Sequence, residues 1–137
     1  MRLFIIVRAC LWTTSANAQT PSELQSMFGN PENGVYIVNP EASLSVTNGS
    51  DGRACHLALE PRDPQKGLST EIASCILNEI VPMNTHRGKP PSAVTYLSCV
   101  AQETQAYRNV TISTTTIDCK RKVQHLTITW RRPPCGN

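Results

Sequence analysis

The six cysteines and three histidines are the residues of this chain with the most distinctive chemistry. Cys119 stands next to Lys120, Arg121 and Lys122, and neighbouring cations stabilise a thiolate. This pattern is compatible with a reactive or intermolecular thiol. The alternative, which the sequence favours, is an ordinary disulfide half in a solvated basic turn. No C-x-x-C pair is present, so a thioredoxin-type redox centre is not indicated.

The histidines give no metal-binding pattern. Cys55 and His56 are adjacent, and neighbours on a strand point to opposite faces, which disfavours a shared metal or a Cys–His catalytic pair. His86 is expected in a loop and His125 at the start of a strand. No H-x-x-x-H or C-x-x-C spacing occurs. We therefore expect no metal and no other cofactor.

Hydrolytic and nucleotide chemistry are not indicated either. The chain lacks G-x-S-x-G, a P-loop and G-x-G-x-x-G. Glu60 and Asp63 flank a proline-bounded turn, and Glu71 and Glu79 are expected on a helix surface. These carboxylates are better explained as solvated surface groups or helix caps than as a catalytic pair. The sequence favours a non-catalytic protein, and no catalytic residue is expected.

The N-terminus has the three parts of a secretory signal peptide. A basic start at Arg2 precedes an apolar stretch over residues 3–7, and Ala16-Asn17-Ala18 is an A-x-A ending. Arg8 interrupts the apolar stretch, and a buried strand over residues 3–7 is the alternative. We expect residues 1–18 to be a signal peptide, and the protein to be periplasmic or secreted.

Cleavage after Ala18 would lower the net positive charge of the chain. Removing Arg2 and Arg8 from the 13 basic residues leaves 11 against 10 acidic ones, a net charge of +1 instead of +3. The basicity of the full chain is therefore no argument for nucleic-acid binding. No apolar run reaches the ~18 residues of a membrane span, so none is expected.

Hydrophobic patterning predicts the secondary structure. Residues 19–34 are polar and broken by proline and glycine, and we expect a flexible N-terminal arm. A helix capped by Ser69 should end at Pro82, because its apolar residues recur at helical spacing. Residues 102–108 are expected to be a polar connection. Strands are predicted over residues 35–38, 43–47, 53–60, 93–100, 110–117 and 123–131.

These elements predict a single α+β domain over residues 35–137. Its antiparallel sheet should have about five to six strands with one helix packed on it, in the order β-β-β-α-β-β-β. The strands over 43–47 and 53–60 should form a hairpin, because the turn-forming residues Asn48 to Gly52 separate them.

Sheet register suggests a disulfide scheme. Five cysteines remain after cleavage, and an oxidising compartment favours their pairing. If the strand over 110–117 pairs with the one over 123–131 across the 118–122 turn, and the strand over 93–100 pairs with residues 108–113, Cys99 and Cys135 fall at the same end of the sheet. Packing of the helix on the hairpin could join Cys55 to Cys75. Cys119 then remains as the candidate free thiol.

Two basic sets lie near the last predicted hairpin. Lys120, Arg121 and Lys122 precede the final strand, and Arg131 and Arg132 follow it. This candidate basic surface would be divided between opposite ends of one strand. Contact with anionic lipid or acidic polysaccharide is one interpretation. The sequence favours the interpretation that these charges are solvated and discourage the edge strand from pairing with another chain.

One resemblance bears on export. The stretches 44–61, 109–113 and 128–132, with Pro82 and Arg87-Gly88-Lys89, resemble small exported bacterial proteins that carry no named activity. The resemblance covers most of the mature chain. It implies export, and no functional residue follows from it.

The expected function is therefore that of an exported, disulfide-stabilised binding or interaction module. Its partner would be an extracytoplasmic protein or polysaccharide, met by an edge strand or a sheet face. Two alternatives are a thiol- or metal-dependent redox protein and an envelope-associated structural factor. Alternate residues of two predicted strands form polar rows that could meet a partner: Ser43, Ser45 and Thr47, and Thr111, Ser113 and Thr115. The sequence favours the simpler interpretation that these side chains face water.

Overall fold

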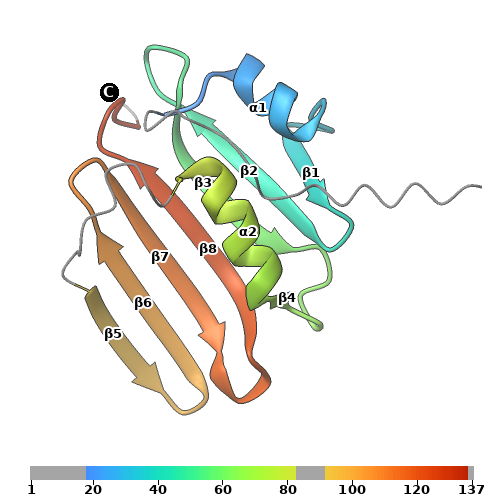
Figure 1. Cartoon of the computed structure of the whole chain (residues 1–137), viewed down its shortest axis with the longest axis vertical. Helices are drawn as coiled ribbons and strands as arrows, with labels where there is room; N and C mark the ends of the chain where they lie inside the picture. The colour runs from blue at the N-terminus through green and yellow to red at the C-terminus, as the bar shows by residue number, and fades with distance from the viewer. Residues whose placement is uncertain (1–17, 83–91, 136–137) are drawn as a thin grey trace, which may run out of the picture.

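The computed structural model describes residues 18–82 and 92–135 as an antiparallel sheet with two short helices (Figure 1). Along the sheet the strand order is β1-β2-β3-β8-β7-β6-β5, and β4 pairs with β8 beside this path. The helices are α1 (Pro21–Phe28) and α2 (Thr70–Ile80), with a 3-10 turn η1 (Asp118–Lys120). The strands are β1 (Val35–Asn39), β2 (Ala42–Asn48), β3 (Ala54–Pro61), β4 (Leu68–Ser69), β5 (Ser92–Leu97), β6 (Val100–Ala106), β7 (Val110–Ile117) and β8 (Lys122–Trp130).

The expected α+β fold with five to six strands and one helix is wrong. Among the described residues the sheet has eight strands, and this part of the chain is mostly β. The predicted strand over 93–100 is divided by a turn at Ser98 and Cys99, where Ser98 has a φ of 56°. The expected polar connection over 102–108 is largely strand β6. Its polar composition is compatible with a strand near the sheet edge, where half-exposed positions do not have to be apolar.

Helix α1 lies within the segment that was expected to be a flexible arm, residues 19–34. A capping box begins it: Thr20 Oγ1 accepts from the Glu23 backbone N–H at 3.2 Å, and the Glu23 carboxylate accepts from the Thr20 N–H at 2.9 Å. Leu24 and Phe28 of this helix are buried. The buried Gln19 donates from Nε2 to the carbonyl of Ile80 at 2.7 Å. These contacts attach the segment to the core.

The predicted hairpin and the predicted central helix are confirmed. β2 and β3 pair antiparallel, and Ser69 caps α2 by accepting from the Ile72 N–H. The pairing of β7 with β8 across the 118–121 turn is also as expected.

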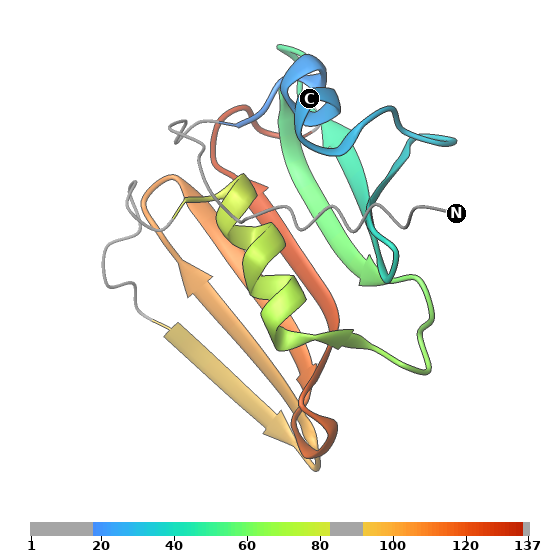
Figure 2. The same cartoon turned by 45° about the vertical axis from the view of Figure 1, so that its right-hand side comes forward.

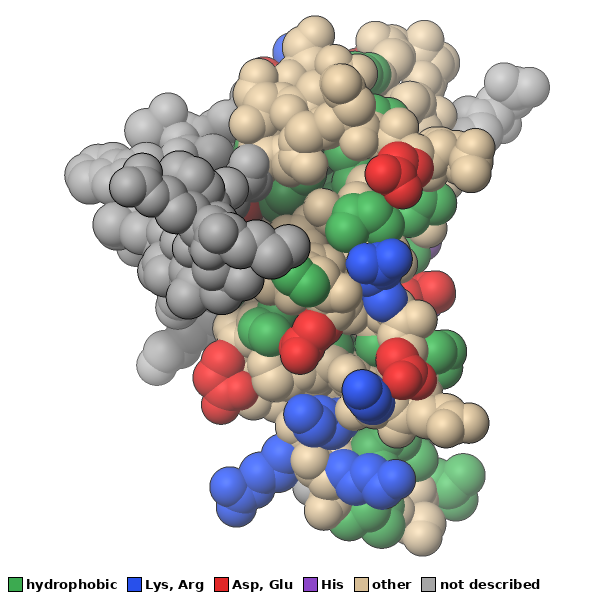
Figure 3. Space-filling model, turned by 90° about the vertical axis from the view of Figure 1, so that its right-hand side faces the viewer, with side chains coloured by type: hydrophobic (Ala, Val, Ile, Leu, Met, Phe, Trp, Pro, Cys, Tyr) green, Lys and Arg blue, Asp and Glu red, His purple; other side chains and the backbone are tan. Residues whose placement is uncertain are grey.

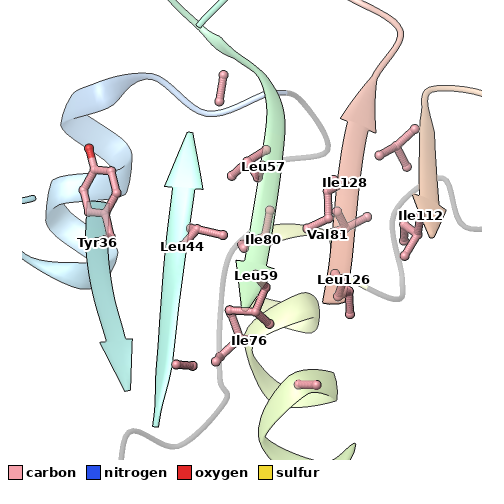
Figure 4. Close-up of a cluster of buried hydrophobic side chains, with 14 of the residues drawn as sticks. Tyr36, Leu44, Leu57, Leu59, Ile76, Ile80, Val81, Ile112, Leu126 and Ile128 are labelled. Carbon is pink, nitrogen blue, oxygen red and sulfur yellow. The ribbon is translucent and has the colours of Figure 1, made fainter. Parts of the chain in front are cut away.

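Both helices pack on the same face of the sheet (Figures 1 and 2), so the core forms a single layer between them and the strands. Ile76 and Ile80 of α2 meet side chains from β2, β3 and β8 (Figure 4). The sheet residues of this cluster include Leu44, Leu57, Leu59, Ile112, Leu126 and Ile128, which alternate along their strands with residues that point the other way.

The C-terminal segment packs against the β2–β3 turn at Gly49. A Cβ at Gly49 would lie 2.7 Å from Pro133 Cγ and 3.0 Å from the Pro134 carbonyl oxygen. We expect Gly49→Ala to lower the free energy of unfolding by about 1–3 kcal/mol, because the added methyl displaces this segment. Urea unfolding measures the effect, with Ser50→Ala, at the exposed next residue, as the control. Wild-type stability in Gly49→Ala would show that this packing is absent in solution.

Candidate functional site

The cysteines are arranged differently from the predicted scheme. Cys55 is bonded to Cys135, with a Cα–Cα distance of 5.3 Å. Cys75 is also disulfide-bonded, but Cys55 is not its partner. The predicted pairs Cys55–Cys75 and Cys99–Cys135 are therefore wrong. Cys119 is an exposed free thiol in η1.

The error in the Cys99 prediction comes from sheet register. β5 pairs with β6 and not with β7, so Leu97 lies opposite Val100, and Val100 lies opposite Ile117. The exposed Cys99 is therefore in a turn beside the end of β7, near η1. Cys135 follows the far end of β8, at the opposite end of the sheet.

The basic residues do not form one surface. Lys120, Arg121 and Lys122 lie at the start of β8, and Arg131 and Arg132 follow its end. Nine residue steps at ~3.3 Å separate Lys122 from Arg131, so the two sets lie about 30 Å apart. Lysine and arginine side chains gather at the lower end of the space-filling view (Figure 3), the end at which Figure 1 shows the β7–β8 turn.

The described histidines lie on neighbouring strands and contact polar side chains. His56 Nδ1 is 2.9 Å from Thr129 Oγ1, and His125 Nδ1 is 3.1 Å from Glu60 Oε1. His86 lies outside the described residues, as do residues 1–17 of the predicted signal peptide. Within residues 18–82 and 92–135, no three His, Cys, Asp or Glu side chains are grouped to hold a metal ion.

Three of the carboxylates singled out in the sequence make local contacts. Asp63 accepts from the Gln65 backbone N–H at 3.0 Å and so stabilises a turn. Glu71 lies in the first turn of α2, where a negative charge favours the helix dipole. Glu60 contacts His125 across the sheet, and both side chains are about half exposed, so the pair contributes little stability.

The sheet face opposite the two helices is the candidate binding surface, which we call the open face. Cross-strand register places its side chains in continuous rows. Thr111, Ser113 and Thr115 of β7 lie opposite Thr129, Thr127 and His125 of β8, and the rows continue into β3 and β2. The polar rows of the open face consist of Ser43, Ser45, Thr47, His56, Glu60, Gln102, Thr104, Thr111, Ser113, Thr115, His125, Thr127 and Thr129. The same register also places Val35, Ile37, Ala58, Thr95 and Ala106 on the open face.

The chain matches no protein-family model, no curated protein and no solved structure. The open face must therefore be interpreted from its own chemistry. A hydroxyl both donates and accepts hydrogen bonds, and Thr104 Oγ1 lies 3.2 Å from Ser113 Oγ. Strands ~4.8 Å apart with alternate residues ~6.7 Å apart give a regular grid of such groups.

The sequence patterns singled out two of these rows but could not place them together. The row on β2 and the row on β7 belong to one face because the register across the two strands between them, β3 and β8, keeps their side chains on the same side of the sheet. The sequence also did not indicate His56, Thr127 and Thr129 as neighbours of those rows.

Among the described residues, no helix is long and apolar enough to cross a membrane.

Proposed function

We propose that this protein is an exported, non-catalytic binding module that recognises an extracytoplasmic polysaccharide through its open face. The observation that carries the proposal is the position of both helices on one side of the sheet. The other side carries rows of hydroxyl, imidazole and amide groups with one carboxylate, together with a few apolar side chains such as Ile37 and Ala58. The Cys55–Cys135 disulfide supports the export part of the proposal, because such bonds persist in oxidising compartments.

The chemistry of the open face favours sugar over protein as the partner. Strong anchors in protein interfaces are mostly Trp, Tyr and Arg, and the residues of the open face include none of these. Short Ser and Thr side chains lose little entropy on ordering. Their hydroxyls can exchange hydrogen bonds with the repeated hydroxyls of an uncharged polysaccharide chain.

Binding to insoluble neutral polysaccharides tests this proposal. Thr127 lies at the centre of the open face, between Ser113 and Ala58. We expect Thr127→Arg to weaken binding by at least about tenfold, or ~1.4 kcal/mol, because its long side chain covers the neighbouring hydroxyls. Ser74→Arg is the matched control, since Ser74 is exposed on α2 at the other side of the sheet. Absent binding, or equal loss in both variants, would overturn the polysaccharide assignment.

Export is tested separately by the intact mass of the protein recovered from the extracytoplasmic fraction. We expect loss of residues 1–18. That cleavage retains Gln19, whose carbonyl accepts from the Ala54 N–H at 2.8 Å, and removes the buried Ala18, whose carbonyl accepts from Arg53 Nη1 at 3.0 Å. A full-length chain confined to the cytosol would overturn both export and an extracytoplasmic partner, whereas the binding measured with the purified protein would stand on its own.

A further inference from the structure

The large exposed hydrophobic side chains of the described residues gather on strand β5. Val94 is 44% exposed, Tyr96 68% and Leu97 79%. Among the described strands, β5 is the last of the sheet and pairs with β6 alone (Figure 1). Its outer side therefore presents backbone N–H and C=O groups without a neighbouring strand among the described residues.

The two edges of the sheet differ in how they are protected. The opposite edge strand β1 is five residues long, is interrupted by a bulge after Ile37, buries Tyr36 and runs close to α1. Bulges, short length and a covering element all discourage pairing with another chain. β5 has neither a bulge nor a covering helix among the described elements. Residues 92–102 also contain no proline and no charged residue.

We propose that two copies of this chain associate by antiparallel pairing of their β5 strands. A twofold axis at Thr95 places Val94 of each copy opposite Tyr96 of the other. Aromatic and β-branched residues form favourable cross-strand pairs. Because residues 92–102 carry no charge, pairing of two identical copies brings no like charges together. The same segment offers no charged group that a charged partner could recognise. A second copy is therefore the occupant that fits this edge.

The paired strands would join two sheets into one. Because the twofold axis is perpendicular to the sheet, the open faces of both copies lie on the same side. The contact between two six-residue strands is small against the ~1,200–2,000 Å² of a stable interface. We therefore expect a dissociation constant roughly in the micromolar range. The dimer does not depend on what the open face binds.

Sedimentation velocity of the oxidised protein over about 1–100 μM tests the dimer. We expect the mass to rise from monomer to dimer with concentration and to fall again on dilution, which separates strand pairing from an intermolecular disulfide. Thr95→Lys and Thr95→Glu should each weaken the dimer at least about tenfold, because two like charges then face each other at the axis. Thr47→Lys, at an exposed threonine of β2, is the matched control.

An equimolar mixture of the Thr95→Lys and Thr95→Glu variants distinguishes this register from other contacts. The introduced lysine of one copy would then face the introduced glutamate of the other, so we expect the mixture to dimerise while each variant alone stays monomeric. Recovery in the mixture also shows that both variants fold. A wild-type monomer at about 100 μM, a dimer retained in Thr95→Lys alone, or no recovery in the mixture would each overturn the proposal.

Discussion

Replacing Cys135 with serine should lower the free energy of unfolding by about 2–5 kcal/mol, the range for removing a disulfide from a small domain. The bond to Cys55 joins residues 80 positions apart, so it closes most of the described chain into one loop. Chain-entropy arguments assign the larger stabilisation to such long loops. Cys135 is exposed, so the serine itself adds no burial cost. Urea unfolding of the oxidised protein measures the change.

Cys119→Ser is the matched control because Cys119 is exposed and not bonded to another cysteine. Its free energy of unfolding should stay within about 0.5 kcal/mol of the wild-type value. The dependence of stability on urea should also steepen in Cys135→Ser, because the unfolded chain expands without the cross-link. Unchanged stability in Cys135→Ser, or a peptide map that joins Cys135 to another cysteine, would contradict the Cys55–Cys135 bond.

The parts of the fold that the sequence predicted are those determined by local patterns. Strict alternation in residues 43–47 and 53–60, divided by a run of turn-forming residues, is sufficient to predict β2 and β3. A serine cap followed by apolar residues at helical spacing predicts α2. Thr20 and Glu23 also form a local signature, a capping box with Pro21 at the first helical position, so α1 was predictable. The glycines and prolines that follow it favoured the wrong interpretation.

The errors concern positions where tertiary context decides the structure. Nothing local requires the chain to reverse at Ser98, and residues 100–106 are polar enough to be a connection. They form a strand because β7 lies beside them to complete the backbone hydrogen bonds. That one missed reversal moved Cys99 to the opposite end of the sheet and gave the wrong disulfide. The candidate site was missed as a surface for a related reason, since its rows come from strands far apart in the sequence.

Leu44 and Ser45 are neighbours on β2 that point to opposite faces, and they provide the sharpest test of the open face. Leu44 is fully buried, with Tyr36 opposite it on β1 and Leu59 on β3. We expect Leu44→Ala to lower the free energy of unfolding by about 2–5 kcal/mol, because it removes buried methyl groups and leaves a cavity in the core. Urea unfolding monitored by circular dichroism measures this loss.

Ser45→Ala should change the free energy of unfolding by less than about 0.5 kcal/mol, because Ser45 is exposed on the open face. The comparison is informative because the two residues are adjacent on one strand. Local effects of an alanine substitution, such as fraying of that strand, should therefore be similar at both positions. A large loss in Ser45→Ala would mean that something covers this face in solution, and the open face would then be an interior surface. A small loss in Leu44→Ala would instead contradict the packing of the helices on the other side.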